Sequence, residues 1–370
     1  MKKTLYAALF ALLGAMTPTL AAADIKVTDV MGRERTLAKP AQRVLLGFYF
    51  EDFLAITGPN AYDRVVAINK SAWHDWRNSQ WKTYSKAIPR IENLIDVGGT
   101  ESNGFSLEKA IAAKPDVAIL SAWQIKTMGE MIDRLEAAGI PVIAADYNAQ
   151  TVEKHVISTM TIGAAMGSMD RARKLASEYK AAVEDIQARV SKAIKAGATP
   201  KRVYVELGHK GPDEYDRTFG NGYMWGGMID QAGGINIANG VVERTAAINP
   251  EHVLAQNPEI ILIPGSYWTK GDKAVLMGFG VSEEETKSRL KPYLKRSGWA
   301  NLDAVKNNQI HAVYHGGART LYDYAFLQYL GKVMYPKAFA DIDPKETHRK
   351  FYERYLPITA TGSFVTGLDD

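Results

Sequence analysis

The chain of 370 residues contains no cysteine. Disulfide bonds and thiolate metal sites are therefore excluded, and no thiol can carry a lipid anchor. The chain also lacks a large excess of either positive or negative charge. The net charge is +4, and no block of like charges suggests a tail that binds nucleic acid. Beyond the N-terminal region, no run of about eighteen apolar residues predicts a membrane span.

The sequence motifs of common enzymes are missing as well. The chain has no G-x-S-x-G elbow, no P-loop and no H-E-x-x-H sequence. Residues 98–104 are rich in glycine, but their spacing differs from that of a dinucleotide-binding loop. Serine, histidine and aspartate occur without a spacing that indicates a catalytic triad. We therefore expect a protein that is not an enzyme and needs no cofactor.

The N-terminus has the pattern of an export signal. Lys2 and Lys3 precede an apolar run from Leu5 to Met16, and three alanines follow at positions 21–23. A charged start, a short apolar stretch and small residues before a cleavage point are typical of a signal peptide. We predict that residues 1–23 are cleaved. Without a lipidated cysteine, we expect the mature protein to be free in the periplasm of a cell with two membranes.

After residue 23, apolar β-branched runs alternate with helical patterns. This alternation predicts βαβ units and mainly parallel sheets, preceded by a hairpin that turns at Gly32. The predicted strands are Val44–Phe48, Val65–Ile68, Val117–Leu120, Val142–Ala145, Val203–Leu207, Ile260–Ile263 and Ile310–Val313. The predicted helices include Leu107–Ala113, Met128–Ala138, Met224–Ala232, His252–Ala255 and Leu321–Met334.

The stretch from Val152 to Ala196 has almost no turn residues. It predicts one long helix, or two abutting ones, capped by Gly197. We expect a helix over residues 151–197 that joins an N-terminal lobe, residues 24–150, to a C-terminal lobe, residues 198–370. The alternative is a helical hairpin inside one domain.

A pattern recurs in the two predicted lobes. Glu108 precedes Pro115 by seven positions, and Glu251 precedes Pro258 by seven positions. In each copy an acidic residue opens a short helix, proline follows the helix, and a buried strand comes next. An acidic residue is favoured in the first turn of a helix. Equal spacing favours two pseudo-symmetric lobes with a cleft between them.

These segments carry a resemblance to a known family. The sequence resembles the periplasmic binding proteins of ABC importers for iron-siderophores, haem and cobalamin. The resembling segments are Asp29–Arg33, Val97–Gly99, Ser106–Lys109, Lys114–Asp116, Gly233–Asn236 and Pro250–Glu251. The resemblance implies an α/β fold of two Rossmann-like lobes, with mainly parallel sheets, joined by one long α-helix. It also implies that the chain captures a metal chelate between its lobes, and a ferric siderophore is the ligand we expect.

The resemblance also implies the partner. In the family, one surface glutamate on each lobe docks onto arginines of the membrane permease, and the matching positions are Glu108 and Glu251. Two exposed carboxylates can form charge-assisted pairs with such arginines. We therefore expect a monomer that docks onto a permease and ATPase complex at the inner membrane and does not bind nucleic acid.

The ligand cleft is expected where loops follow the carboxyl ends of parallel strands. Five such loops are rich in aromatic and basic residues. Aromatic rings offer flat apolar area to a large chelate, and arginine donates to carboxylate or catecholate oxygens. The candidate ligand-binding residues are Trp73, His74, Trp76, Arg77, Trp123, His209, Arg217, Tyr267, Trp268, His315 and Arg319.

Other ligands remain open from the sequence. A haem or corrinoid could take an axial histidine or tyrosine. A bare metal ion requires three or four nitrogen or oxygen ligands, but no paired-histidine motif predicts a metal site. A small oxyanion such as molybdate could bind arginine and backbone N–H groups. A partner-binding protein without a ligand is disfavoured by the aromatic bias of the loops.

Overall fold

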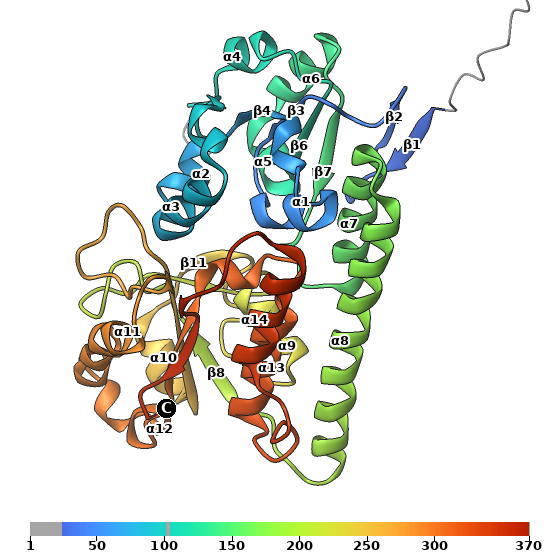
Figure 1. The fold of residues 1–370 in the computed structure, drawn as a ribbon. Helices are drawn as coiled ribbons and strands as arrows, with labels where there is room; N and C mark the ends of the chain where they lie inside the picture. The colour runs from blue at the N-terminus through green and yellow to red at the C-terminus, as the bar shows by residue number, and fades with distance from the viewer. Residues whose placement is uncertain (1–23, 101–103, 370) are drawn as a thin grey trace, which may run out of the picture.

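The computed structural model describes residues 24–100 and 104–369. The predicted signal peptide lies outside the described residues. Two lobes lie one above the other, and a long helix runs beside both (Figure 1). Each lobe contains a twisted sheet, so the α/β fold class predicted from the sequence is confirmed. Within the described part of the chain, no helix has the length and apolar composition to cross a membrane.

The N-terminal lobe is built on a parallel sheet with strand order β5-β4-β3-β6-β7. The four strands predicted here are present, because their apolar runs are buried on both faces. The expected hairpin precedes them as the antiparallel pair β1 (Ile25–Thr28) and β2 (Glu34–Leu37). The sheet strands are β3 (Val44–Leu46), β4 (Val65–Ile68), β5 (Ile95–Asp96), β6 (Val117–Ser121) and β7 (Val142–Ala145). The helices are α1 (Phe50–Thr57), α2 (Lys70–His74), α3 (Asn78–Ala87), α4 (Leu107–Ala112), α5 (Ala122–Met128) and α6 (Glu130–Ala137).

The C-terminal lobe has a second five-stranded sheet, ordered β10-β8-β12-β14-β16, in which only β16 is antiparallel to its neighbour. The sheet strands are β8 (Arg202–Val205), β10 (Ile235–Asn236), β12 (Ile260–Gly265), β14 (Ile310–Tyr314) and β16 (Val365–Gly367). The small pairs are β9 (Arg217–Phe219) with β11 (Thr245–Ala247) and β13 (Gly278–Phe279) with β15 (Gly362–Ser363). The helices are α9 (Trp225–Gln231), α10 (Pro250–Gln256), α11 (Glu283–Leu290), α12 (Asp303–Lys306), α13 (Tyr324–Met334) and α14 (Pro344–Tyr355).

The segment expected as one connecting helix over 151–197 is two helices, α7 (Val152–Met166) and α8 (Met169–Lys195). Gly167 takes a left-handed conformation with φ of +69°, which ends α7 and turns the chain back. A Cβ on Gly163 would lie 2.3 Å from that of Ala172, so the two helices pack closely beside the turn. Only α8, about 40 Å long, runs along both lobes and contacts α1 and α13 (Figure 1). The segment therefore combines a hairpin with a strut.

A buried hydrogen-bond network joins the lobes. The Glu51 carboxylate at the start of α1 accepts bonds from the hydroxyls of Tyr322 and Tyr352, at 2.6 and 2.8 Å. Neighbouring Asp52 accepts the backbone N–H of Leu321 at 2.6 Å. Because these groups are almost completely buried, breaking the network would leave polar atoms unpaired, which is costly. The network therefore fixes the two lobes relative to each other.

Candidate ligand-binding cleft

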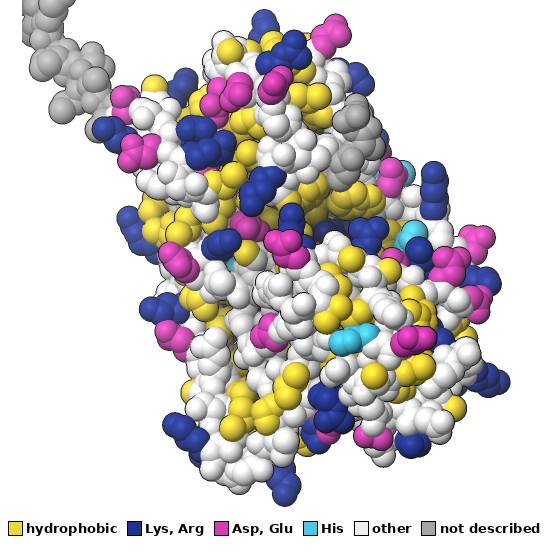
Figure 2. Space-filling model, turned by 180° about the vertical axis from the view of Figure 1, so that it is seen from behind, with side chains coloured by type: hydrophobic (Ala, Val, Ile, Leu, Met, Phe, Trp, Pro, Cys, Tyr) yellow, Lys and Arg dark blue, Asp and Glu magenta, His cyan; other side chains and the backbone are white. Residues whose placement is uncertain are grey.

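A cavity of about 390 Å³ lies between the two lobes. Figure 2 shows a recess across the middle of the molecule, in which hydrophobic side chains adjoin Lys and Arg side chains. The carboxyl ends of β4, β6, β8, β12 and β14 all lead into loops that reach this cavity or its edge. Its lining residues are Trp76, Trp123, Asn148, Leu207, His209, Arg217, Phe219, Tyr223, Met224, Thr245, Trp268, His315 and Arg319.

The N-terminal lobe supplies an aromatic wall. The rings of Trp76 and Trp123 are stacked with centroids 6.4 Å apart. Both meet the edge or face of Phe48, which follows β3 and is fully buried, at 6.3 and 5.5 Å. These T-shaped contacts are a favoured geometry for aromatic pairs. Phe48 therefore supports both indoles from behind.

The opposite wall comes from the C-terminal lobe. His209, after β8, and Trp268, after β12, meet edge to face with ring centroids 5.1 Å apart. The loop that carries Trp268 is tied to the other lobe, because the Ser266 hydroxyl donates to the Trp76 carbonyl at 2.9 Å and the Asn78 N–H donates to the Tyr267 carbonyl at 2.9 Å. The two aromatic walls are therefore held at a set separation.

Two buried arginines flank the base of the aromatic wall. The guanidinium carbons of Arg77 and Arg319 lie 5.0 and 5.1 Å from the centre of the Phe48 ring. Nε of each arginine, and Nη2 of Arg77, have no hydrogen-bond partner among the described residues. Burial and the charge of Arg77 lower the pKa of Arg319 to about 9. Two positive charges therefore lie at the base of the wall without an ion-pair partner among the described residues, and Arg319 is the one that lines the cavity.

The segment that presents Arg319 is anchored to the N-terminal lobe. Leu321 and Tyr322 bond to Asp52 and Glu51, as described above, and the Oδ2 atom of Asp323 lies 3.0 Å from Nε2 of His155 on α7. Two of the four residues after Arg319 therefore bond to the N-terminal lobe, and a third bonds to α7. This anchoring places a cation of the C-terminal lobe against a ring of the N-terminal lobe.

His315 lies beside these arginines. Burial, together with Arg319, Arg77 and Arg217, holds the pKa of His315 well below its usual range, so the imidazole is neutral at physiological pH. Its Nδ1 accepts a hydrogen bond of 3.3 Å from Nε1 of Trp225. A neutral ring with Nδ1 as acceptor carries its proton on Nε2.

A second cavity, of about 350 Å³, continues the cleft and shares Trp123, Asn148 and Tyr223 with the first. Asn148 spans the boundary, since its amide oxygen accepts from Tyr49 at 2.8 Å and its amide nitrogen donates to Tyr223 at 3.0 Å. The second cavity adds further cations, Lys126, Lys154 and Arg244, against one acidic side chain, Asp146. The whole cleft is therefore predominantly basic.

The structure brings seven of the eleven predicted ligand-binding residues to this cavity. They are Trp76, Trp123, His209, Arg217, Trp268, His315 and Arg319. Arg77 lies next to them, buried against Phe48. Its position is consistent with the expected role, although it is not among the lining residues.

Three predicted residues lie elsewhere. Trp73 is a core residue, fully buried and stacked on Phe50 with centroids 4.5 Å apart, because it occupies the inward face of α2. His74 is partly exposed and pairs with Asp75 at 2.6 Å. The Tyr267 side chain is 37% exposed and does not line the cavity.

The sequence reasoning missed Asn148, Tyr223 and Arg244. Asn148 follows β7, so the rule that selected the other loops, a position after a parallel strand, could have found it. Tyr223 and Arg244, which stack with the guanidinium carbon 4.6 Å from the ring centre, follow no parallel strand, and no sequence signal marks them. Among the described residues, His, Cys, Asp and Glu side chains form no group of three that could hold a metal ion.

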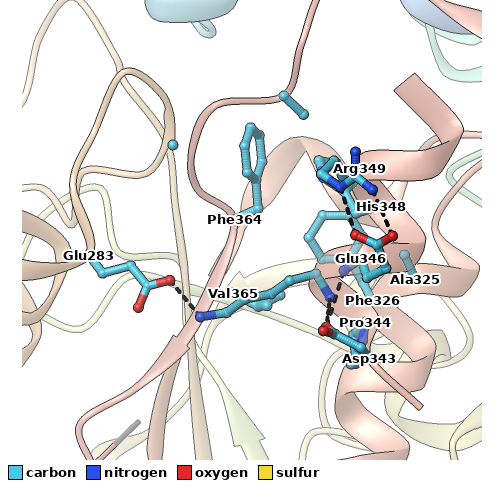
Figure 3. Close-up of a pocket in the computed structure, with 13 residues that line it drawn as sticks. Glu283, Ala325, Phe326, Asp343, Pro344, Glu346, His348, Arg349, Phe364 and Val365 are labelled. Carbon is cyan, nitrogen blue, oxygen red and sulfur yellow. Dashed lines mark hydrogen bonds and ion pairs between the residues drawn. The ribbon is translucent and has the colours of Figure 1, made fainter. Parts of the chain in front are cut away.

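Another cavity, of about 240 Å³, lies within the C-terminal lobe at the start of α14. Its charged side chains pair with one another: Lys345 with Glu283, and Arg349 with Glu346 (Figure 3). His348 lies at its base, where burial lowers the pKa to about 3. Since this cavity involves one lobe and its ions are already satisfied, the interlobe cleft is the better candidate.

Comparison with known proteins agrees with this architecture. The model of a family described as periplasmic binding protein matches residues 44–314. The structure of the TroA-like periplasmic binding protein FepB from Veillonella parvula is 33% identical, with a TM-score of 0.84, and the match covers 93% of this chain and 99% of that one.

More distant relatives share the fold. The molybdate-binding protein MolA of Haemophilus influenzae is 22% identical over 350 residues, which are 90% of this chain and 92% of MolA. Its molybdate-bound structure has a TM-score of 0.69. CeuE of Helicobacter pylori, solved as a Ni-His complex, is 17% identical, with a TM-score of 0.65 and coverage of 91% and 97%. The chain thus belongs to the periplasmic binding protein family and is the substrate-binding component of an ABC transporter, not an enzyme.

Proposed function

We propose that this protein captures an anionic metal chelate, a ferric siderophore, in the cleft between its lobes and delivers it to the permease and ATPase of an inner-membrane importer. One observation carries the proposal. Arg319 lines the aromatic cavity and Arg77 is buried next to it against Phe48, and neither arginine has an ion-pair partner among the described residues.

The charge of these arginines indicates the charge of the ligand. Burying an unpaired cation is costly, so proteins normally pair it with an acidic group. Glu51 and Asp52 lie close enough to interact electrostatically with Arg77, but their carboxylates bond to Tyr322, Tyr352 and the Leu321 N–H instead. An anion in the cleft would pair with Arg319, which lines it, and would offset the cost of burying the two cations.

The size and walls of the cavity support an organic chelate. A volume of about 390 Å³, extended by the neighbouring 350 Å³, falls in the range of sites for drug-sized ligands. The indoles of Trp76, Trp123 and Trp268 offer flat apolar surface to aryl groups. Catecholate or carboxylate oxygens of a ferric chelate would face the arginines, which donate well to such oxygens.

A small oxyanion is the second candidate, because the relative MolA binds molybdate according to its name. The arginine floor could hold a tetrahedral anion. Such an anion would leave the tryptophan walls without a contact. Haem and corrinoids would use the walls but need the arginines only for their carboxylates or amides.

Calorimetry separates these ligands. Iron(III) tris-catecholate, sodium molybdate, haemin and cobalamin would each be titrated into the wild type, an Arg319→Met variant and an Arg354→Met control. The guanidinium of Arg354 is exposed, pairs with Glu178 and lines neither cavity of the cleft. We expect the ferric catecholate to bind, the binding to be lost in Arg319→Met, and the control to behave as wild type. Binding of molybdate alone would replace the proposal with oxyanion transport.

Delivery requires docking, and we assign it to Glu108 and Glu251. Both are exposed, one on each lobe, at the starts of α4 and α10. We also propose that the mature chain acts as a monomer in the periplasm after removal of residues 1–23. Its lobes are held together by the buried Glu51 network. The permease would therefore meet Glu108 and Glu251 in a nearly fixed arrangement.

A further inference from the structure

Two exposed apolar side chains stand beside the proposed docking glutamates. Large hydrophobic residues with more than a third of their surface exposed are few among the described residues, and they include Ile111 at 39% and Leu254 at 37%. Ile111 follows Glu108 by three positions on α4, and Leu254 follows Glu251 by three on α10. At this spacing on a helix the two side chains share a face. The next residues, Ala112 and Ala255, are exposed as well.

The two helices occupy equivalent places in their lobes. α4 precedes β6, which lies between the lobe's first sheet strand, β3, and the following strand, β7. α10 precedes β12, which lies between β8, again the first sheet strand, and β14. The pairing of a glutamate with an aliphatic residue is thus repeated in three dimensions, not only in sequence.

Both helices are also anchored in the same way. Arg43, before β3, donates from its side chain to the carbonyls of Lys114 and Ala113, at 2.8 and 2.7 Å. Arg202, at the start of β8, donates to the carbonyls of Asn257 and Gln256, at 3.2 and 3.0 Å. A cation at the carboxyl end of a helix satisfies its free carbonyls.

The residues that follow α4 and α10 correspond as well. Lys114 and Asn257 both take the left-handed conformation, with φ of +48° and +43°. The acidic residue two positions later, Asp116 or Glu259, accepts the backbone N–H of the anchoring arginine at 3.0 or 3.1 Å. Two matching and well-fixed modules therefore present the same exposed pair of side chains.

We infer that each docking patch consists of a glutamate and an aliphatic residue, Glu108 with Ile111 and Glu251 with Leu254, and that the partner presents a cation beside an apolar surface at two places. The inference rests on the proposed docking to the membrane permease. Among the ion pairs of residues 24–100 and 104–369, none involves either glutamate. Both carboxylates are therefore available to a partner, as are the side chains next to them.

The ion pair and the apolar contact would contribute differently to docking. An exposed ion pair contributes little and is screened by salt. Burial of an aliphatic side chain contributes more, and salt does not weaken it. The glutamates would therefore govern the rate and orientation of encounter, whereas Ile111 and Leu254 would govern how long the complex lasts.

Surface plasmon resonance tests this with the cognate permease–ATPase complex in lipid nanodiscs. The double variant Ile111→Ser with Leu254→Ser is compared with a control, Met31→Ser with Ile194→Ser, whose two residues are exposed to 36% and 39% elsewhere. We expect the patch variant to dissociate at least roughly tenfold faster, both at low salt and at 0.5 M salt. The control should match wild type, and all variants should keep the wild-type melting temperature.

The outcomes distinguish the inference from the function on which it rests. If wild type binds the complex and the patch variant dissociates at the wild-type rate, the aliphatic residues have no role and the inference is wrong. If the patch variant dissociates faster than wild type at low salt but not at 0.5 M salt, the change in dissociation rate is electrostatic and the inference is also wrong. If wild type does not bind the complex at all, the proposed docking function fails together with it.

Discussion

The hydroxyl of Tyr322 in the C-terminal lobe donates a hydrogen bond of 2.6 Å to the carboxylate of Glu51 in the N-terminal lobe. Both side chains are buried, and Tyr352 and Tyr84 donate to the same carboxylate at 2.8 Å. Tyr322 follows Arg319, which lines the cleft, by three positions in the chain. The contact that holds the lobes together therefore also places a candidate ligand-binding cation.

Removing the Tyr322 hydroxyl should weaken the interface. Tyr322→Phe leaves one donor fewer at a buried carboxylate, and we expect a loss of about 1–3 kcal/mol in the free energy of unfolding. Thermal melting followed by circular dichroism measures it. Tyr293→Phe is the matched control, because the Tyr293 hydroxyl is buried but has no hydrogen-bond partner among the described residues. Equal melting temperatures for the two variants would show that the Glu51 network does not join the lobes energetically.

Arg319→Met should separate binding from stability. The guanidinium is buried and makes no ion pair with another described residue, so replacing it with an apolar chain removes a cost in the free protein. We expect a melting temperature equal to or above that of wild type. The affinity for an anionic chelate should fall at least roughly a hundredfold, which corresponds to about 2.7 kcal/mol. A variant that is less stable and binds normally would mean that Arg319 is a structural residue.

The neutral state of His315 predicts the effect of pH. Burial and the neighbouring arginines hold the pKa of His315 well below its usual value, so the imidazole stays neutral as the pH falls through the usual histidine range. The pH dependence of anion affinity should therefore be the same in wild type and in His315→Asn. Calorimetric titrations at several pH values measure both profiles. If the wild-type affinity alone rose below pH 6.5, His315 would be gaining a proton that the ligand uses.

The docking glutamates should affect uptake without affecting capture. Glu108 and Glu251 lie outside the cleft lining, so the double variant Glu108→Ala with Glu251→Ala should bind ligand as wild type does. We expect it to abolish uptake of a radiolabelled ferric chelate by cells. A control with the same change of charge is Glu92→Ala with Glu243→Ala, which also removes one exposed carboxylate from each lobe. Normal uptake by the first variant would refute the docking role.

Much of the fold could be predicted from the sequence because it depends on the periodicity and burial of apolar residues. Runs such as Val65–Ile68 and Val142–Ala145 are observed with the predicted bounds, since apolar β-branched segments of this length form strands in parallel sheets. The break between α7 and α8 was harder to predict. A single glycine, Gly167, reverses the chain there, although glycine inside a helical pattern is often tolerated.

The cleft could be located from the sequence, but not every residue that lines it. Loops after parallel strands must meet at one edge of a sheet. This rule selected Trp76, Trp268 and Arg319 from the sequence, and all three line the same cavity. Trp73 lies only three residues from Trp76 yet packs on Phe50 in the core. Because a short helix in that loop decides which ring turns inward, spacing alone could not separate the two.

Native mass spectrometry of the protein purified from the periplasm tests the central claim most directly. If the basic aromatic cleft holds an anionic ferric chelate, the wild-type protein should carry an iron-containing anion of defined mass. That mass should be absent from Arg319→Met and present in Arg354→Met. Molybdate, or a neutral or cationic ligand retained by all three proteins, would contradict the account.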